Sequence, residues 1–77
     1  MKVGLAKYFK KNLTKNTELI GLQVVNRDDE KFFINDFDSF LFDEAMPRSL
    51  FVTKKKDSEF GWYIDSDDLY VEIEEEK

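Results

Sequence analysis

The 77-residue chain has a net charge of −5 and contains neither cysteine nor histidine. It is long enough for one small domain, residues 1–77, and it excludes disulfide bridges, thiolate zinc sites and histidine-based catalysis. We therefore expect no enzymatic activity, no catalytic residue, no metal and no cofactor. No apolar run reaches the roughly 18 residues of a membrane span, and the first residues do not open a signal peptide, so we expect a soluble, cytoplasmic protein.

Aromatic residues and charges are both distributed unevenly. Eight Phe, three Tyr and one Trp make up 16% of the chain. A buried ring removes about 150–250 Å² from water, so a few rings can stabilise a small core. Residues 1–16 carry a charge of +5 and residues 17–77 carry −10. We expect the basic segment to pack on an acidic sheet or to attract a charged partner.

The N-terminal segment, residues 3–13, fits two structures. The spacing i, i+3, i+4 and i+8 of a helical stripe is occupied by Leu5, Tyr8, Phe9 and Leu13. A strand that is broken at Lys7 is the alternative, and it would begin at Val3. We predict a short helix, because the lysines suit an exposed helical face and Asn12 suits a helix end.

Residues 18–25 read as a strand with alternating side chains. The face that we expect to point into the core carries Ile20, Leu22 and Val24. Gly21 indicates a bulge or a close approach of the backbone. The polar run 26–30 predicts a hairpin loop, after which residues 31–34 return as a second strand.

The stretch around residues 36–46 is ambiguous. Asn35 or Asp36 could cap a helix that ends before Pro47, since the residue before proline avoids the helical region. The apolar stripe of that helix would consist of Phe37, Phe40, Leu41 and Ala45. A strand with Phe40 and Phe42 on one face is the alternative. We predict a short helical or irregular excursion here.

The C-terminal half reads as three more strands. Residues 49–54 and 59–64 are rich in aromatic and β-branched residues, and residues 55–58 form the loop between them. One face of the second of these strands carries Phe60, Trp62 and Ile64. Polar residues 65–68 predict a corner, and residues 69–73 alternate as a half-exposed last strand. Five short strands predict a mostly β (α+β) fold closed into a small barrel, because closure removes exposed edges.

Residues 61–69 (Gly-Trp-Tyr-Ile-Asp-Ser-Asp-Asp-Leu) resemble the end of an SH3-like barrel, where a Gly-led strand runs into a 3₁₀ corner that contains Ser. They are also similar to the closing segment of small phage-type and bacterial proteins. The resemblance implies a five-stranded SH3-like barrel. Asp65 and Asp68 stand where that family has Pro and Tyr, so it gives little support to binding of proline-rich peptides.

A concentration of phenylalanine in residues 32–42 is the main functional signal. Phe32 and Phe33 are adjacent in a predicted strand, so they cannot both face one core. Exposed rings mark interaction surfaces, unless the helix predicted over residues 3–13 covers them. Interleaved acids can imitate phosphates. We predict that the partner-binding residues are Phe37, Phe40, Phe42, Asp36, Asp38, Asp43 and Glu44.

The sequence contains residues for two other kinds of site, a nucleic-acid site and a metal site. A nucleic-acid site would use Lys54, Lys55, Lys56, Lys10 and Lys11. The acidic overall charge disfavours it, because phosphate contacts need a concentrated positive face. The carboxylates at Asp65, Asp67 and Asp68 could approach a metal, but Tyr70 occupies the position where a calcium loop needs glycine. We interpret them as a solvated turn.

We expect a non-enzymatic module that binds another protein, of the kind that phages and mobile elements use as accessory proteins or inhibitors. A nucleic-acid-binding barrel is the first alternative. A homodimer with a structural role is the second. We expect no membrane partner.

Overall fold

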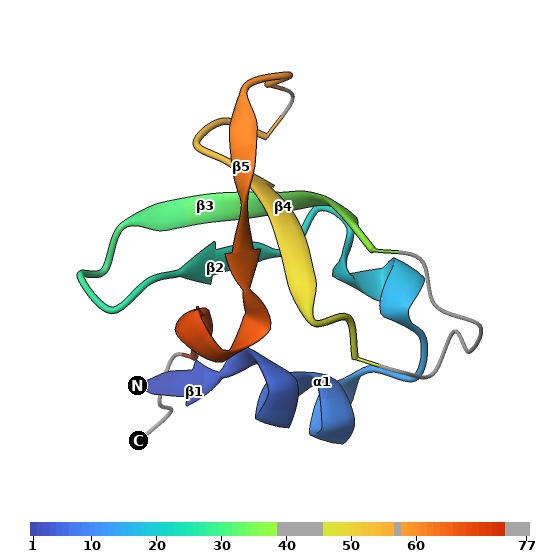
Figure 1. Cartoon of the computed structure of the whole chain (residues 1–77). Coiled ribbons are helices and arrows are strands. Elements are labelled where there is room, and N and C mark those ends of the chain that lie inside the picture. Colours follow the sequence, from blue (N-terminus) through green and yellow to red (C-terminus); the bar gives the residue numbers. More distant parts are fainter. Residues whose placement is uncertain (39–45, 57, 74–77) are drawn as a thin grey trace.

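The computed structural model describes residues 1–38, 46–56 and 58–73. Within these ranges the chain forms one antiparallel sheet of six strands in the order β1-β6-β2-β3-β4-β5, together with one α-helix and two 3₁₀ turns (Figure 1). The mostly β, α+β class is confirmed. The closed barrel of five strands is wrong, because the sheet is open: β1 lies at one edge and β5 at the other.

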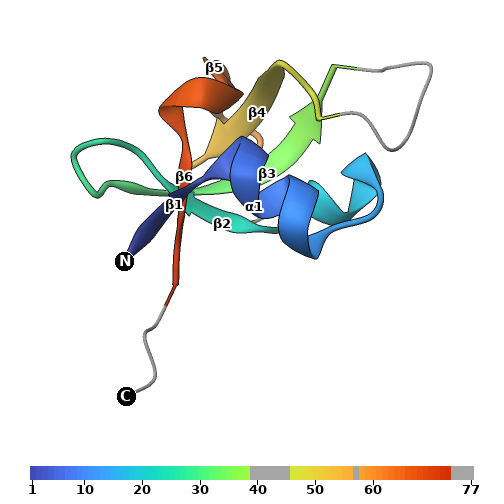
Figure 2. The same cartoon turned by 90° about the horizontal axis from the view of Figure 1, so that it is seen from below.

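The N-terminal segment divides between a strand and a helix. Strand β1 (Lys2–Gly4) pairs antiparallel with β6 (Tyr70–Glu72), and Figure 2 shows the two strands side by side. Helix α1 (Leu5–Asn12) follows directly, with Leu5 and Phe9 buried. The predicted helix is confirmed, but it begins two residues later than expected, because Val3 pairs with Val71 in the sheet.

The prediction of a strand over residues 18–25 is wrong in its first half. Asn16–Leu19 forms a 3₁₀ turn, the chain reverses at Gly21 with a φ of 87°, and only β2 (Gln23–Val25) joins the sheet. A positive φ is a conformation that glycine adopts readily. The turn buries Leu19 and leaves Ile20 48% exposed, which is the reverse of the predicted alternation.

The predicted hairpin loop over residues 26–30 is confirmed. The Oδ1 atom of Asn26 accepts hydrogen bonds from the backbone N–H groups of Asp28 and Glu30, both at 2.9 Å. Asp29 adopts a positive φ of 65° at the tip and forms an ion pair with Lys2 at 2.8 Å. This pair is a direct contact between the basic N-terminal segment and the acidic remainder of the chain.

Strand β3 (Lys31–Phe37) runs through the point where a helix was predicted to begin. Its pairing with β4 (Ser49–Thr53) shifts between Ile34 and Asp36, which makes Asn35 the extra residue of a bulge. Asn35 is held there by a hydrogen bond from its amide to the Thr53 hydroxyl at 2.6 Å. The bulge restores Phe37 to the core side, opposite Leu50. The rest of the predicted excursion, residues 39–45, lies outside the described residues.

The last strands lie far apart in the sheet although they are neighbours in sequence. Strand β5 (Gly61–Asp65) pairs with β4, and β6 pairs with β1 and β2. The 3₁₀ turn Ser66–Asp68 carries the chain between them, at the predicted corner. Because β5 and β6 do not pair with each other in the described structure, the sheet stays open.

The core forms between the sheet and α1. Leu5 and Phe9 of the helix belong to the same hydrophobic cluster as Phe32. Phe33 is only half-buried, in agreement with the prediction that Phe32 and Phe33 face opposite ways. The other buried members of the core are Leu19, Val24, Ile34, Leu50, Val52, Leu69 and Val71.

Candidate functional site

The exposed aromatic side chains gather on one edge of the sheet. Among the described residues, five large hydrophobic side chains are exposed, and three of them lie within four positions: Phe60 at 86%, Trp62 at 44% and Tyr63 at 57%. We call these three residues the β5 aromatic surface. Tyrosine, tryptophan and phenylalanine are enriched in protein–protein interfaces, so their exposure on one strand identifies a candidate site.

Trp62 is anchored on the core side of the sheet. It lies opposite the buried Val52, and its ring meets that of Phe32 edge-to-face, with centroids 5.5 Å apart and planes at 86°. The Nζ atom of Lys54 lies 4.9 Å from the centroid of the Phe32 ring and 2.9 Å from Oε2 of Glu30. The indole therefore rests on a fixed ring and exposes its outer part to solvent.

Tyr63 lies on the opposite face of the sheet. Its ring contacts that of Phe51 edge-to-face, with centroids 5.3 Å apart. In the strand register Phe51 lies between Tyr63 on β5 and Asp36 on β3. A predicted site residue, the exposed Asp36, therefore belongs to the same cross-strand row as Tyr63.

The backbone of β5 presents hydrogen-bonding groups at the open edge. The N–H of Ser66 donates to the carbonyl of Arg48 at 2.8 Å. Arg48 and Ser66 are opposite each other when the β4–β5 register is extended by one residue, so they form a hydrogen-bonded pair. Hydrogen-bonded pairs alternate with non-bonded pairs along an antiparallel ladder. The N–H and C=O groups that point away from β4 are therefore those of Gly61, Tyr63 and Asp65.

Over the described residues, this edge lacks several of the devices that protect sheet edges in most proteins. Proteins block edge strands with proline, lysine, bulges or very short strands. Strand β5 contains neither proline nor lysine, and its five residues pair with β4 without a shift in register. The opposite edge strand, β1, is only three residues long and carries the charged Lys2. Strand β5 is thus the edge that is open to another strand.

The two ends of β5 carry opposite charges. Exposed Lys54, Lys55 and Lys56 precede the strand, in the loop from β4. At the other end lie the exposed carboxylates of Asp65, Asp67 and Asp68. Lys54 is paired with Glu30 and the loop also carries the exposed Glu59, so a strand that binds along this edge would meet the ammonium groups of Lys55 and Lys56 beside one carboxylate at one end and a cluster of aspartates at the other.

The predicted site residues are only partly brought together. Asp36 and Asp38 are exposed, and Phe37 is half-buried against the core. The remaining predicted residues, Phe40, Phe42, Asp43 and Glu44, lie outside the described residues. The predicted partner-binding set therefore stays a prediction.

The predicted nucleic-acid residues do not form one surface. Lys10 and Lys11 lie on α1, and Lys54–Lys56 lie in the loop between β4 and β5, at the opposite end of the molecule (Figure 1). Lys54 is also paired with Glu30.

The β5 aromatic surface was missed because the predicted partner-binding set lies within residues 36–44, and Phe60 and Trp62 were predicted only to share one face of a strand. Phe60 precedes the strand and is the most exposed of the three rings, and Trp62 is covered on one side only. A signal was present in the sequence. Trp62 and Tyr63 are adjacent, so one of them had to leave the core, by the same argument that separates Phe32 from Phe33.

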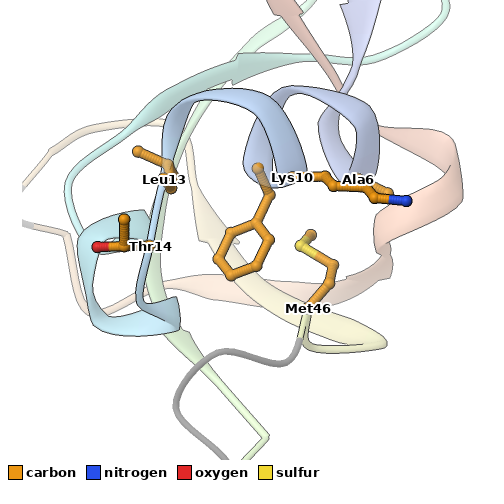
Figure 3. A pocket seen from close by; sticks show the side chains of 6 residues that line it. Ala6, Lys10, Leu13, Thr14 and Met46 are labelled. Atoms are coloured by element: carbon orange, nitrogen blue, oxygen red, sulfur yellow. The ribbon is translucent and has the colours of Figure 1, made fainter.

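A second feature is a mainly apolar hollow of about 480 Å³ beside α1. Figure 3 shows it between the helix end, with Leu13 and Thr14, and the side chain of Met46; Ala6, Phe9 and Lys10 complete its lining. Among the described residues that line it, Lys10 is the only one with a charged side chain, and we assign no chemistry to the hollow.

The described residues show no cluster of side chains that could hold a metal ion. They contain no group of three or more acidic, histidine or cysteine side chains placed to hold a metal ion. Hydrogen bonds from Thr14 and Lys15 lower the pKa of Glu18, and those from Lys54 and Asn26 lower the pKa of Glu30. Both carboxylates hold loops in place.

Over the described residues, no helix has the length and apolar character needed to cross a membrane.

Comparisons of the chain with protein-family models, with curated proteins and with solved structures gave no match. The resemblance of residues 61–69 to SH3-like barrels therefore stays a prediction. The candidate site depends on its geometry alone.

Proposed function

We propose that the chain is a non-enzymatic protein-binding module, and that it binds an extended segment of protein along the open edge of β5. The observation that carries the proposal is the coincidence of two features on one strand. The outward N–H and C=O groups of Gly61, Tyr63 and Asp65 lie beside the exposed rings of the β5 aromatic surface.

Strand addition uses both features. A peptide that joins an edge strand gains affinity from main-chain hydrogen bonds and specificity from contacts of alternate side chains. Trp62 and Tyr63 project to opposite faces of the sheet, so a bound strand would meet one ring on each face. Each ring is already supported, by Phe32 and Phe51 respectively, which limits the side-chain entropy that binding must overcome.

The acidic residues extend the proposal to the neighbouring face. Asp36 lies in the same cross-strand row as Phe51 and Tyr63, so a partner side chain beside Tyr63 would be near a carboxylate. Of the acidic–aromatic surface predicted from the sequence, Asp36 alone among the described residues is part of the proposed site in this way. The role of an accessory protein or inhibitor of phage type stays a prediction.

The proposal favours protein over nucleic acid. The two lysine groups lie at opposite ends of the molecule, and Lys54 forms an ion pair with Glu30. Binding of a polyanion needs a concentrated positive face.

A site-specific cross-linking experiment tests the proposal. A photoreactive benzoylphenylalanine replaces Phe60, the most exposed ring, and the protein is irradiated in a lysate of its source cell. The same group at Lys7, on the exposed face of α1, controls for random collisions. The backbone edge is tested with Tyr63→Pro, which removes an outward N–H, against Tyr63→Thr, which keeps it and also deletes the ring.

We expect protein adducts from position 60 and none from position 7. The adducts should disappear with Tyr63→Pro and persist, at reduced yield, with Tyr63→Thr. Circular dichroism shows whether Tyr63→Pro folds; if it does not, Tyr63→Lys, which keeps the strand but charges the edge, takes its place. Equal adduct yields from positions 60 and 7 would overturn the proposal. Adduct yields from position 60 that are the same in every Tyr63 variant would also overturn it.

A further inference from the structure

We infer that the strand bound at the β5 edge is β5 of a second copy of this chain, joined antiparallel about a two-fold axis at Tyr63. The inference rests on the proposed function, since it names the occupant of the same edge. A two-fold interface uses one surface twice, so that surface must be complementary to itself. The β5 edge meets this condition in its hydrogen bonds, its side chains and its charges.

The hydrogen-bonding pattern permits a symmetric pair centred on Tyr63. In such a pair, residues at equal distances on either side of the axis lie opposite each other, so Gly61 would face Asp65 of the second copy. The outward groups of β5 are those of Gly61, Tyr63 and Asp65, as derived from the β4–β5 register. The two Tyr63 residues would exchange both N–H···O bonds, which is the arrangement of a hydrogen-bonded pair. All five residues of the strand would be paired.

The side chains match in the same register. Trp62 would lie opposite Ile64 of the second copy, on the core side of both sheets. Trp62 is 44% exposed and Ile64 is half-buried, so both have apolar surface left to cover. On the other face the two Tyr63 rings would meet beside the Phe51 rings that already contact them. Aromatic and β-branched cross-strand pairs are among the most stabilising in sheets.

The charges decide the direction. Antiparallel pairing places Lys55 and Lys56 of one β4–β5 loop near Asp65, Asp67 and Asp68 of the second copy, and it does so twice. Parallel pairing would bring lysine to lysine and aspartate to aspartate. Like charges across an interface disfavour the wrong arrangement and opposite charges fix the register.

The assembly closes at two copies. The other edge strand, β1, has only three residues, and Lys2 within it is held by an ion pair with Asp29. A head-to-tail contact of β5 with β1 would generate an open filament. When β5 pairs with β5, neither copy has an unpaired β5 edge left for a third copy.

The test uses two charge-reversed proteins and their mixture. One protein carries Lys55→Glu with Lys56→Glu, and the other carries Asp67→Lys with Asp68→Lys. Alone, each brings like charges together at both ends of the interface. Mixed, the two restore an attractive contact at each end. Sedimentation equilibrium from about 1 μM to about 1 mM measures the association, and emission of Trp62, the only tryptophan, reports burial at the interface.

We expect wild type to dimerise with a blue shift of Trp62 emission. Each charge-reversed protein alone should dimerise at least roughly tenfold more weakly, and the equimolar mixture should recover wild-type affinity. Tyr63→Pro should be monomeric and Tyr63→Thr should still dimerise. Wild type that stays monomeric at about 1 mM would overturn the inference. A dimer whose dissociation constant is the same in wild type and in both charge-reversed proteins would also overturn it.

The two proposals fail separately. If the purified protein is monomeric while position 60 still cross-links to another protein in a Tyr63-dependent manner, the protein-binding edge stands and the second copy as its occupant is wrong. If position 60 gives no adducts and the purified protein is monomeric, both proposals are wrong.

Discussion

The ring of Tyr63 lies edge-to-face against that of Phe51, with centroids 5.3 Å apart, while more than half of Tyr63 remains exposed at the edge of the sheet. This contact connects stability to the proposed interface. It fixes an exposed ring in place before any partner arrives, and an edge-to-face pair of this kind contributes about 0.5–1.5 kcal/mol beyond the area that it buries.

We predict that Phe51→Ala and Tyr63→Ala are coupled in a double-mutant cycle. The coupling measured by urea unfolding should be about 0.5–1.5 kcal/mol, the value typical of aromatic pairs. Trp62→Ala combined with Phe51→Ala is the matched control, because the two rings lie on opposite faces of the sheet. Equal coupling in the two cycles would show that the Tyr63 ring is not held by Phe51.

The reversed exposure of Leu19 and Ile20 gives a second prediction. Leu19→Ala should lower the free energy of unfolding by about 2–5 kcal/mol, because it opens a cavity in the core. Ile20→Ala removes a side chain that is 48% exposed and should change stability by no more than about 0.5–1 kcal/mol. Thermal or urea unfolding of the two variants decides between this structure and the alternation expected of a continuous strand, which predicts the opposite order.

Gly61 marks a point where the backbones of β4 and β5 approach closely. A Cβ atom at this position would overlap the carbonyl oxygen of Val52 and would lie 2.8 Å from Cγ2 of Thr53. Gly61→Ala should therefore destabilise the fold by about 1–3 kcal/mol, because backbone atoms must move. Gly4→Ala is the control, since a Cβ atom there meets nothing within 4 Å. If the two variants unfold at the same urea concentration, β5 does not lie as close to β4 as described.

Glu18 gives a prediction for the dependence of stability on pH. Its Oε1 atom accepts hydrogen bonds from the Thr14 hydroxyl at 2.7 Å and from the N–H groups of Thr14 at 3.0 Å and Lys15 at 2.9 Å, and these bonds lower its pKa below 4.5. A lowered folded-state pKa means that the stabilisation is complete above the unfolded-state value and is lost as the pH falls through the folded-state value.

Glu18→Gln should accordingly lower the melting temperature at neutral pH. The difference from wild type should shrink as the pH falls below about 4.5, because wild type then loses the charge as well. Glu59→Gln, which neutralises an exposed carboxylate in the loop before β5, is the control. A Glu18→Gln effect that is constant from neutral to acidic pH would show that the carboxylate charge is not what holds the turn.

The local features of this protein can be predicted from residues that are close together in the chain. The spacing of Leu5 and Phe9 predicts the helix, the polar run 26–30 predicts the hairpin, and the alternation of Leu69 and Val71 predicts the buried face of the last strand. These features depend on neighbours a few positions apart, so periodicity and turn chemistry are sufficient to find them.

The other features depend on the packing of distant segments in the fold. It placed the bulge at Asn35, which returns Phe37 to the core, and the turn at Gly21, which exchanges the roles of Leu19 and Ile20. It also decided that β5 is an edge. Alternation tells which side chains share a face, but whether a face is covered and whether a strand has a second neighbour depend on segments distant in the chain. For that reason the sequence shows that Trp62 and Tyr63 face opposite ways, but not that both are exposed at an edge of the sheet.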